Sequence, residues 1–303
     1  MPEALPLADV AARPATAAEA IRDLARCFRQ AGIATPERDA RLLVLHACGL
    51  SAEAYILAPE TPLTADAGAR VAEACRRRLE REPVSRIIGR REFWGRSFEV
   101  GPATLDPRAD TETLVEAVLG IVSEAGRRDA PLRVLDLGTG TGCILLSLLA
   151  EMPHATGFGI DIDPAALGVA ARNAAALGLS ARALFCCCDW VAPIVGCFDV
   201  IVTNPPYIEH SDIARLDPEV RLYDPPSALD GGADGFAAYR RIMVEVFPLA
   251  RPGALFALEA GAGQMSQLID LLINSGWVSS RSSCNVYTDL GAHERAVAVL
   301  KQG

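Results

Sequence analysis

The first 85 residues place apolar side chains three or four positions apart, which is the spacing of helices that bury one face. Thr16 and Glu19 have the spacing of a capping box, so a helix is predicted to follow Thr16. Further helices are predicted over residues 35–49 and over about 64–80. Residues 1–85 are therefore expected to form an N-terminal helical domain.

The pattern changes after residue 85. β-branched and aromatic side chains, interrupted by Gly89 and Gly95, predict a β-hairpin over 86–100 within a linker that spans 86–109. From 110 to 303, strand patterns alternate with helical ones, which predicts the α/β class with a Rossmann-like, doubly wound parallel sheet. Strands are expected over 133–137, 156–162, 183–188, 198–203 and 254–258, helices over 111–123, from 142, 164–177, 239–248 and 264–275, and a closing strand pair over 277–287 and 295–300.

Composition places the chain among folded globular proteins, because 50% of its 303 residues are hydrophobic and 22% are charged. No apolar run reaches the roughly 20 residues of a membrane-spanning helix and no secretory signal is legible, so a cytoplasmic protein without membrane contact is expected. Nine cysteines, without CxxC pairs, favour reduced thiols. Neighbouring strand residues face opposite sides, so the run Cys186-Cys187-Cys188 predicts small buried side chains and no metal site.

Charge divides the chain unevenly. The first 100 residues carry 15 basic and 14 acidic side chains, whereas the other residues carry 14 and 24, within a net charge of −9. Nine arginines lie between positions 70 and 96. They are interpreted either as a solvated helix face with ion pairs four residues apart, or as a docking patch for an acidic or RNA-associated partner.

A glycine-rich loop follows the predicted strand over 133–137 and reads Gly138-Thr139-Gly140-Thr141-Gly142-Cys143. Glycine lets a backbone approach a ligand and adopt positive φ. Cys143 stands where dinucleotide sites usually have a further glycine, so the spacing favours S-adenosylmethionine over NAD. Asp161, at the end of the next strand, is predicted to bind ribose hydroxyls, whereas Asp163 caps a helix. Asp136 either bonds loop amides or faces the amino group of the ligand.

The sequence Asn204-Pro205-Pro206-Tyr207 follows the predicted strand over 198–203. Two prolines fix φ and remove two amide donors, which leaves a rigid backbone with free carbonyl groups. The Asn204 oxygen and the Pro205 carbonyl can accept both hydrogens of an NH₂ group, and Tyr207 can stack on a planar group. The alternative is an Asn-Pro turn without a ligand. Beside the glycine loop, the motif predicts methylation of a planar nitrogen.

With these motifs, the chain resembles the class I S-adenosylmethionine-dependent methyltransferases, and among them the peptide chain release factor N5-glutamine methyltransferases, the PrmC/HemK family. The resemblance covers nearly the whole length. Three features depart from it: Ala109 stands where many members have proline, Asp106 stands where an aliphatic residue is common, and residues 291–295 differ mildly from the usual closing motif. Besides the two motifs, the similar segments are 39–43, 82–89, 92–95, 105–112 and 228–235.

The resemblance implies methyl transfer from S-adenosylmethionine, with S-adenosylhomocysteine as product, to the glutamine of the Gly-Gly-Gln tip of class I release factors. This methylation assists translation termination. The helical domain is expected to recognise the release factor, and the protein to act as a monomer. Cofactor contacts are implied for residues 138–142, Asp136, Asp161, Asp189, Trp190 and Asn204, and substrate contacts for Asn204, Pro205, Pro206 and Tyr207, of which Asn204, Pro205 and Tyr207 are the expected catalytic residues.

Three other functions are compatible with the same motifs. A ribosomal-protein glutamine methyltransferase would also act on a planar side-chain amide, and a DNA adenine-N6 methyltransferase would act on the planar NH₂ group of adenine. DNA binding is not expected, because residues 101–303 carry the acidic excess and phosphates attract basic faces. A cofactor-binding scaffold without activity is the third alternative.

Overall fold

The computed structural model describes residues 16–191 and 194–302. The chain divides into two compact units, one made of residues 1–89 with Pro218–Tyr223, and the other of Arg90–Asp217 with Asp224–Gly303. Each unit is described by itself. No helix of the described residues is long and apolar enough to span a membrane.

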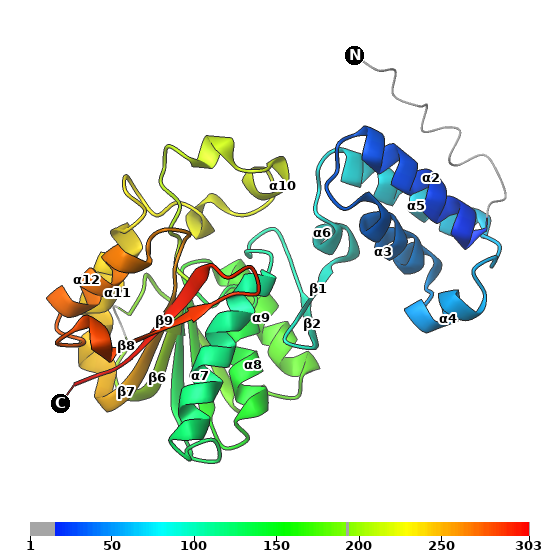
Figure 1. Ribbon diagram of the computed structural model, residues 1–303. Coiled ribbons are helices and arrows are strands. Elements are labelled where there is room, and N and C mark those ends of the chain that lie inside the picture. Colours follow the sequence, from blue (N-terminus) through cyan, green and yellow to red (C-terminus); the bar gives the residue numbers. More distant parts are fainter. Residues whose placement is uncertain (1–15, 192–193, 303) are drawn as a thin grey trace. The chain divides into compact units, whose positions relative to one another are not determined.

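The first unit is a helical bundle, and Figure 1 shows α2, α3 and α5 side by side. The capping box is confirmed, because the Glu19 amide donates to Thr16 Oγ1 at 3.3 Å and the Thr16 amide donates to Glu19 Oε2 at 3.1 Å. Phe28 and Leu43 are fully buried in its core. Its helices are α2 (Ala17–Gln30), α3 (Pro36–Cys48), α4 (Ala52–Leu57), α5 (Ala65–Leu79), α6 (Val84–Ile88) and α10 (Pro218–Arg221).

A distant segment joins this bundle through Glu219, whose carboxylate accepts from Arg78 Nη1 at 3.1 Å. Arg78 is buried and also donates from Nε to Asp39 at 2.8 Å. Tyr223 donates its hydroxyl hydrogen to the Glu80 carbonyl at 2.8 Å. These bonds explain why Pro218–Tyr223 belongs to the first unit although the flanking residues belong to the second.

One prediction for this region needs correction, and one pair of alternatives is narrowed. The hairpin begins at Arg90, because Val84–Ile88 form α6, which ends where Gly89 takes a φ of +78°. Such short helices carry too few turns for a periodic pattern. The arginines of α5 favour the solvated-helix interpretation, since Arg76 pairs with Glu73 and Glu80, both at 2.6 Å.

The second unit is an α/β sandwich around a seven-stranded sheet with the order β5-β4-β3-β6-β7-β9-β8. The first five of these strands are parallel, and β9 pairs antiparallel with both β7 and β8, which confirms the predicted Rossmann-like sheet and its closing strand pair. The sheet strands are β3 (Arg133–Leu137), β4 (Thr156–Asp161), β5 (Ala183–Cys187), β6 (Phe198–Thr203), β7 (Ala250–Glu259), β8 (Cys284–Thr288) and β9 (Glu294–Leu300).

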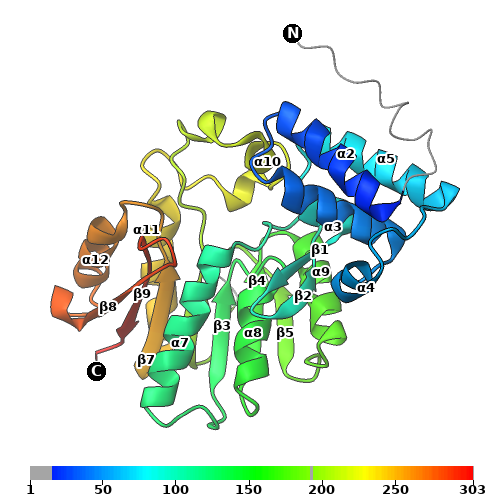
Figure 2. The ribbon, with the colours of Figure 1, turned by 45° about the vertical axis from the view of Figure 1, so that its right-hand side comes forward.

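Helices cover both faces of this sheet. Alternate residues of each strand supply two separate apolar cores, as in β3, where Val134 faces one core and Leu135 the other. Figures 1 and 2 show α7 (Glu112–Glu124), α8 (Cys143–Glu151) and α9 (Pro164–Ala176) over one face. The other face packs against α11 (Ala237–Val246) and α12 (Met265–Asn274).

A separate hairpin, β1 (Arg90–Phe93) and β2 (Arg96–Glu99), packs on the first face through Phe93 and Phe98. Short 3₁₀ turns complete the unit: η1 (Ala109–Thr111), η2 (Ile213–Arg215), η3 (Pro226–Ala228), η4 (Phe247–Leu249) and η5 (Arg281–Ser283).

The three consecutive cysteines are less buried than predicted. Cys187 is exposed, and Cys186 and Cys188 are half-buried. The physical reason is that β5 is an edge strand, so the sheet covers it on one side only.

Candidate functional site

Four adjacent parallel strands, β4, β3, β6 and β7, end at one edge of the sheet. Asp161 is the last residue of β4, the glycine loop follows β3, Asn204 follows β6, and Glu259 is the last residue of β7. In α/β proteins ligands bind outside this edge, where the chain leaves the sheet in opposite directions. Here the sequence order of the strands reverses between β3 and β6.

The glycine loop joins β3 to α8 through three residues with positive φ: Gly138 at +69°, Gly140 at +53° and Gly142 at +78°. A Cβ atom at Gly138 would meet nothing within 4 Å, so the space beside this residue is open. At Gly142 a Cβ atom would lie 3.1 Å from Leu146 Cδ1, which makes its role one of packing and turn geometry.

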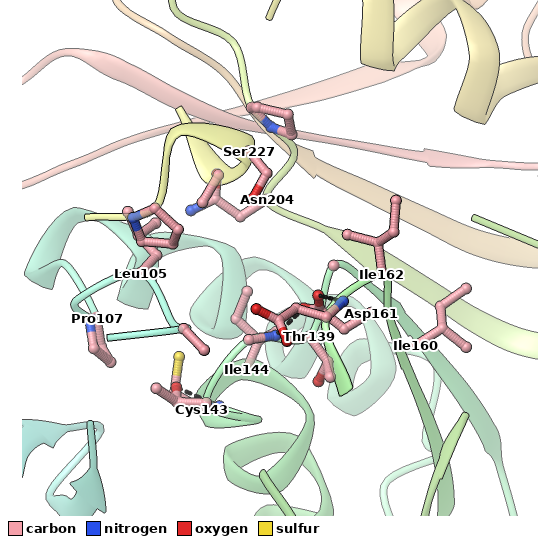
Figure 3. Close-up of a pocket in the computed structure, with 18 of the residues that line it drawn as sticks. Leu105, Pro107, Thr139, Cys143, Ile144, Ile160, Asp161, Ile162, Asn204 and Ser227 are labelled. Carbon is pink, nitrogen blue, oxygen red and sulfur yellow. Dashed lines mark hydrogen bonds between the residues drawn. The ribbon is translucent and has the colours of Figure 1, made fainter. Parts of the chain in front are cut away.

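A cavity of about 220 Å³ opens at this edge. Figure 3 shows Asn204 and Ser227 on one side of it, and Thr139 and Asp161 on another. Four predicted site residues lie outside its lining: Asp136, Gly142, Pro205 and Tyr207. The predicted residues that line it are Gly138, Thr139, Gly140, Thr141, Asp161, Asp189, Trp190, Asn204 and Pro206.

Two carboxylates hold the glycine loop. Asp161 accepts from the Gly140 amide at 2.9 Å and from the Asp163 amide at 3.0 Å, and burial raises its pKa. Asp136 is fully buried and accepts from Thr139 Oγ1 at 2.7 Å. Burial raises the pKa of Asp136 to about 7, and the neighbouring Asp161 charge adds to the effect. The structure therefore places Asp136 beneath the loop and Asp161 at the cavity.

The segment after β5 brings Asp189 and Trp190 to the cavity. Trp190 has a φ of +54°, which is unusual for a residue with a side chain, and its carbonyl accepts from Cys188 Sγ at 2.9 Å. Arg241 of α11 pairs with Asp189 at 2.8 Å. These bonds fix the turn that presents both residues.

The Asn-Pro-Pro-Tyr loop is supported by glycines in the segment that follows it. A Cβ atom at Gly231 would lie 2.8 Å from Tyr207 Cα, and one at Gly235 would lie 2.5 Å from the Tyr207 carbonyl oxygen. Gln264 Nε2 donates to the same carbonyl at 2.9 Å. The loop therefore needs glycine in the segment 228–235, which is one of the family-like segments of the sequence.

Behind the loop, Asn204 and Tyr207 reach two residues that the sequence did not predict. Asn204 Nδ2 donates to Thr111 Oγ1 at 3.2 Å. The Tyr207 hydroxyl donates to Glu259 Oε1 at 3.3 Å. Burial raises the pKa of Glu259 to about 7, with Asp110 contributing, while hydrogen bonding from Thr111, the positive charge of Arg295 and the Tyr207 hydroxyl oppose the rise.

Other cavity residues also escaped the sequence analysis as site residues. They come from the loop before α7 and from η3, and Arg108 of the first loop pairs with the buried Asp224 just before η3. The sequence did contain a signal for these residues, because both loops lie within or beside the family-like segments 105–112 and 228–235. These residues are Ala103, Leu105, Pro107, Arg108, Thr111, Pro225, Ser227 and Ala228; the other lining residues that were not predicted lie close in sequence to the predicted ones and are Cys143, Ile144, Ile160, Ile162, Asp163 and Cys188.

The fold and the site together define a methyltransferase. A family model described as "Methyltransferase domain" matches residues 128–287, and one described as "PrmC N-terminal domain" matches residues 19–89. The crystal structure of the hMettl16 catalytic domain in complex with MAT2A 3′UTR hairpin 6 has the same fold, with a TM-score of 0.54 at 16% identity over 68% of this chain and 76% of that one.

Two curated relatives specify the family. The release factor glutamine methyltransferase of Rhodospirillum rubrum is 47% identical over 275 residues, which is 91% of this chain and 82% of that protein. The protein of the same name from Deinococcus radiodurans is 36% identical over 90% of this chain and 94% of its own length. The chain belongs to the release factor glutamine methyltransferase family, which confirms the resemblance drawn from its motifs.

Proposed function

We propose that this protein transfers a methyl group from S-adenosylmethionine to the side-chain amide nitrogen of the glutamine in the Gly-Gly-Gln segment of class I peptide chain release factors. One observation carries the proposal: the glycine loop after β3 and the Asn-Pro-Pro-Tyr loop after β6 contribute to the same cavity. One loop is suited to the methyl donor and the other to a planar amide.

The cavity fits S-adenosylmethionine. Gly138 and Gly140 leave open space and accessible backbone for the methionine part, and Asp161 retains carboxylate lone pairs for the ribose. Asp163 and Asp189 add negative charge to the lining, where Arg108 is the basic residue, so a cationic ligand is favoured. When bound, the cofactor supplies an electrophilic methyl group and leaves as S-adenosylhomocysteine.

An amide nitrogen is a weak nucleophile, so orientation must supply much of the rate enhancement. Asn204 is proposed to accept one hydrogen of the glutamine NH₂ group through its side-chain oxygen. Pro205 does not itself line the cavity, but it lies between two residues that do, Asn204 and Pro206, and its carbonyl is proposed to accept the other hydrogen. Each acceptor also stabilises the positive charge that develops on nitrogen as its bond to carbon forms. The displaced proton then passes to solvent.

Mass spectrometry of a class I release factor, incubated with this protein and S-adenosylmethionine, tests the proposal. We expect one added methyl group on the Gly-Gly-Gln glutamine and no addition to a release factor in which that glutamine is replaced. A ribosomal protein and adenine-containing DNA serve as parallel substrates. Modification of one of these alone would overturn the proposed substrate. Cofactor binding without methyl transfer to any of them would favour a cofactor-binding scaffold without activity.

The helical unit is proposed to orient the release factor, and one chain is proposed to suffice because every cavity residue belongs to the second unit of the same chain. Intact release factor is then expected to have a lower KM than a short peptide containing Gly-Gly-Gln. Equal KM values for the two substrates would contradict a recognition role for the helical unit.

A further inference from the structure

The side chain of Asn204 is oriented from outside its own loop. Its Nδ2 donates to the hydroxyl of Thr111, a residue 93 positions earlier in the chain that ends η1 and precedes α7. Thr111 is buried, with 3% of its surface exposed, yet it reaches the cavity lining. This bond uses the nitrogen end of the Asn204 amide, which leaves the oxygen end for another partner.

The Thr111 hydroxyl in turn faces the carboxyl group of Glu259, which is 1% exposed. Tyr207 donates to Glu259 Oε1. Oε2 has no hydrogen-bond partner among the described residues, and the Thr111 hydroxyl is one of the groups that lower the pKa of this carboxyl. Tyr239 holds the same residue by donating to its backbone carbonyl at 2.8 Å.

The chemistry of these groups gives the chain of hydrogen bonds a direction. Above pH 7 the Glu259 carboxyl has lost its proton and only accepts, so the Thr111 hydroxyl hydrogen can point to it. The Thr111 oxygen then offers lone pairs to its other neighbour, and Asn204 must present its NH₂ group to them. If the Asn204 amide were reversed, its NH₂ group would face the substrate, and two donors would meet without an acceptor.

We propose that Thr111 and Glu259 are positioning residues that hold the Asn204 amide with its oxygen toward the substrate nitrogen. This inference rests on the proposed function, because it assigns the orientation of the amide that binds the glutamine. It adds two residues to the site, and neither belongs to the glycine loop or to the Asn-Pro-Pro-Tyr loop.

Variants at Thr111 separate orientation from packing. Thr111→Val keeps the shape and removes the hydroxyl, so kcat on the release factor is expected to fall about 10- to 100-fold while the Kd for S-adenosylmethionine changes less than about twofold. Thr111→Ser, which restores the hydroxyl, is expected to recover most of kcat. Thr113→Val is the matched control, because Thr113 is a buried threonine two positions further on, in the first turn of α7, and lies outside the cavity lining.

Glu259→Gln tests the direction of the chain when both enzymes are assayed above pH 7, where the wild-type carboxylate only accepts whereas the amide can donate to Thr111 and reverse the order of donors. We expect kcat to fall in this variant as well. A Thr111→Val enzyme within about twofold of the wild-type kcat, or a Thr111→Ser enzyme as slow as Thr111→Val, would overturn the proposal.

A second readout does not depend on the substrate. In ¹H–¹⁵N spectra of the protein, the Asn204 side-chain NH₂ signals are expected to shift and to exchange faster in Thr111→Val and in Glu259→Gln, but not in Thr113→Val. Unchanged signals in both variants would refute the orienting contact. If the signals changed in the variants but the wild-type enzyme methylated no glutamine, the orienting contact would be supported and the proposed function would be rejected.

Discussion

The buried carboxyl group of Asp136 makes a quantitative prediction about stability. Its side chain lies beneath the glycine loop with none of its surface exposed, and burial raises its pKa from 3.8 to about 7. The folded protein therefore keeps a proton on Asp136 at a pH where the unfolded chain has lost it. The stability that this proton contributes is complete below pH 3.8 and is lost as the pH rises through about 7.

The size of the effect follows from the shift. A rise from 3.8 to about 7 corresponds to about 4 kcal/mol over the full pH range. Between pH 5 and pH 8 the folded state loses about 3 kcal/mol of this, because the unfolded carboxyl is already ionised at pH 5. Asn in place of Asp136 cannot ionise, so Asp136→Asn is expected to reduce the loss of stability between these pH values by about 3 kcal/mol.

Urea unfolding without cofactor at pH 5 and pH 8 measures this difference. All three tryptophans, Trp94, Trp190 and Trp277, belong to the second unit, so tryptophan fluorescence reports the unit that contains Asp136. Comparing each variant with itself at two pH values cancels any pH-independent cost of the substitution. Asp129→Asn, at an exposed turn, is the control. If Asp136→Asn kept the full wild-type loss, the assigned burial effect would be refuted.

Three further predictions concern the site. Asn204→Ala is expected to lower kcat about 100-fold or more with nearly unchanged cofactor affinity by calorimetry, and equal losses in both would contradict its role at the reacting amide. Gly235 has a φ of +74°, and the Cβ atom of Gly235→Ala would lie 2.5 Å from the Tyr207 carbonyl oxygen, so this variant is expected to lose more kcat than cofactor affinity. Wild-type kinetics in Gly235→Ala would show that the loop does not need this glycine. Asp161→Asn is expected to weaken cofactor binding about tenfold, because the carboxylate accepts from the Gly140 amide at one oxygen and from the Asp163 amide at the other, whereas an Asn side chain can accept at only one of these positions; an unchanged Kd would contradict the role of Asp161.

Local sequence patterns predicted most elements of the fold. The capping box of Thr16 and Glu19 needs only residues three apart, and it is present. The strand before the glycine loop was predicted over the same residues that form β3. The short helices α4 and α6 were missed, because five or six residues are too few to show a helical period. The exposure of Cys187 was also missed, because it depends on which strand lies at the sheet edge.

By itself the sequence determined the chemistry that the site can offer. The glycine loop and Asn204-Pro205-Pro206-Tyr207 are continuous segments, so their backbone constraints are local and can be recognised without a fold. The same is true of the alternation of strands and helices, which indicated the parallel sheet and therefore a shared edge for both loops.

Only the tertiary structure decided how these residues are held. Glu259 lies 52 positions from Tyr207, and Thr111 lies 93 positions from Asn204, and neither has a local motif of its own. They meet because β6 and β7 are neighbours and the start of α7 reaches the same edge. Strand order and burial are properties of the packed chain, and they also set the pKa of Asp136 and Glu259, since both carboxyl groups lose their contact with water only when the sheet and helices assemble.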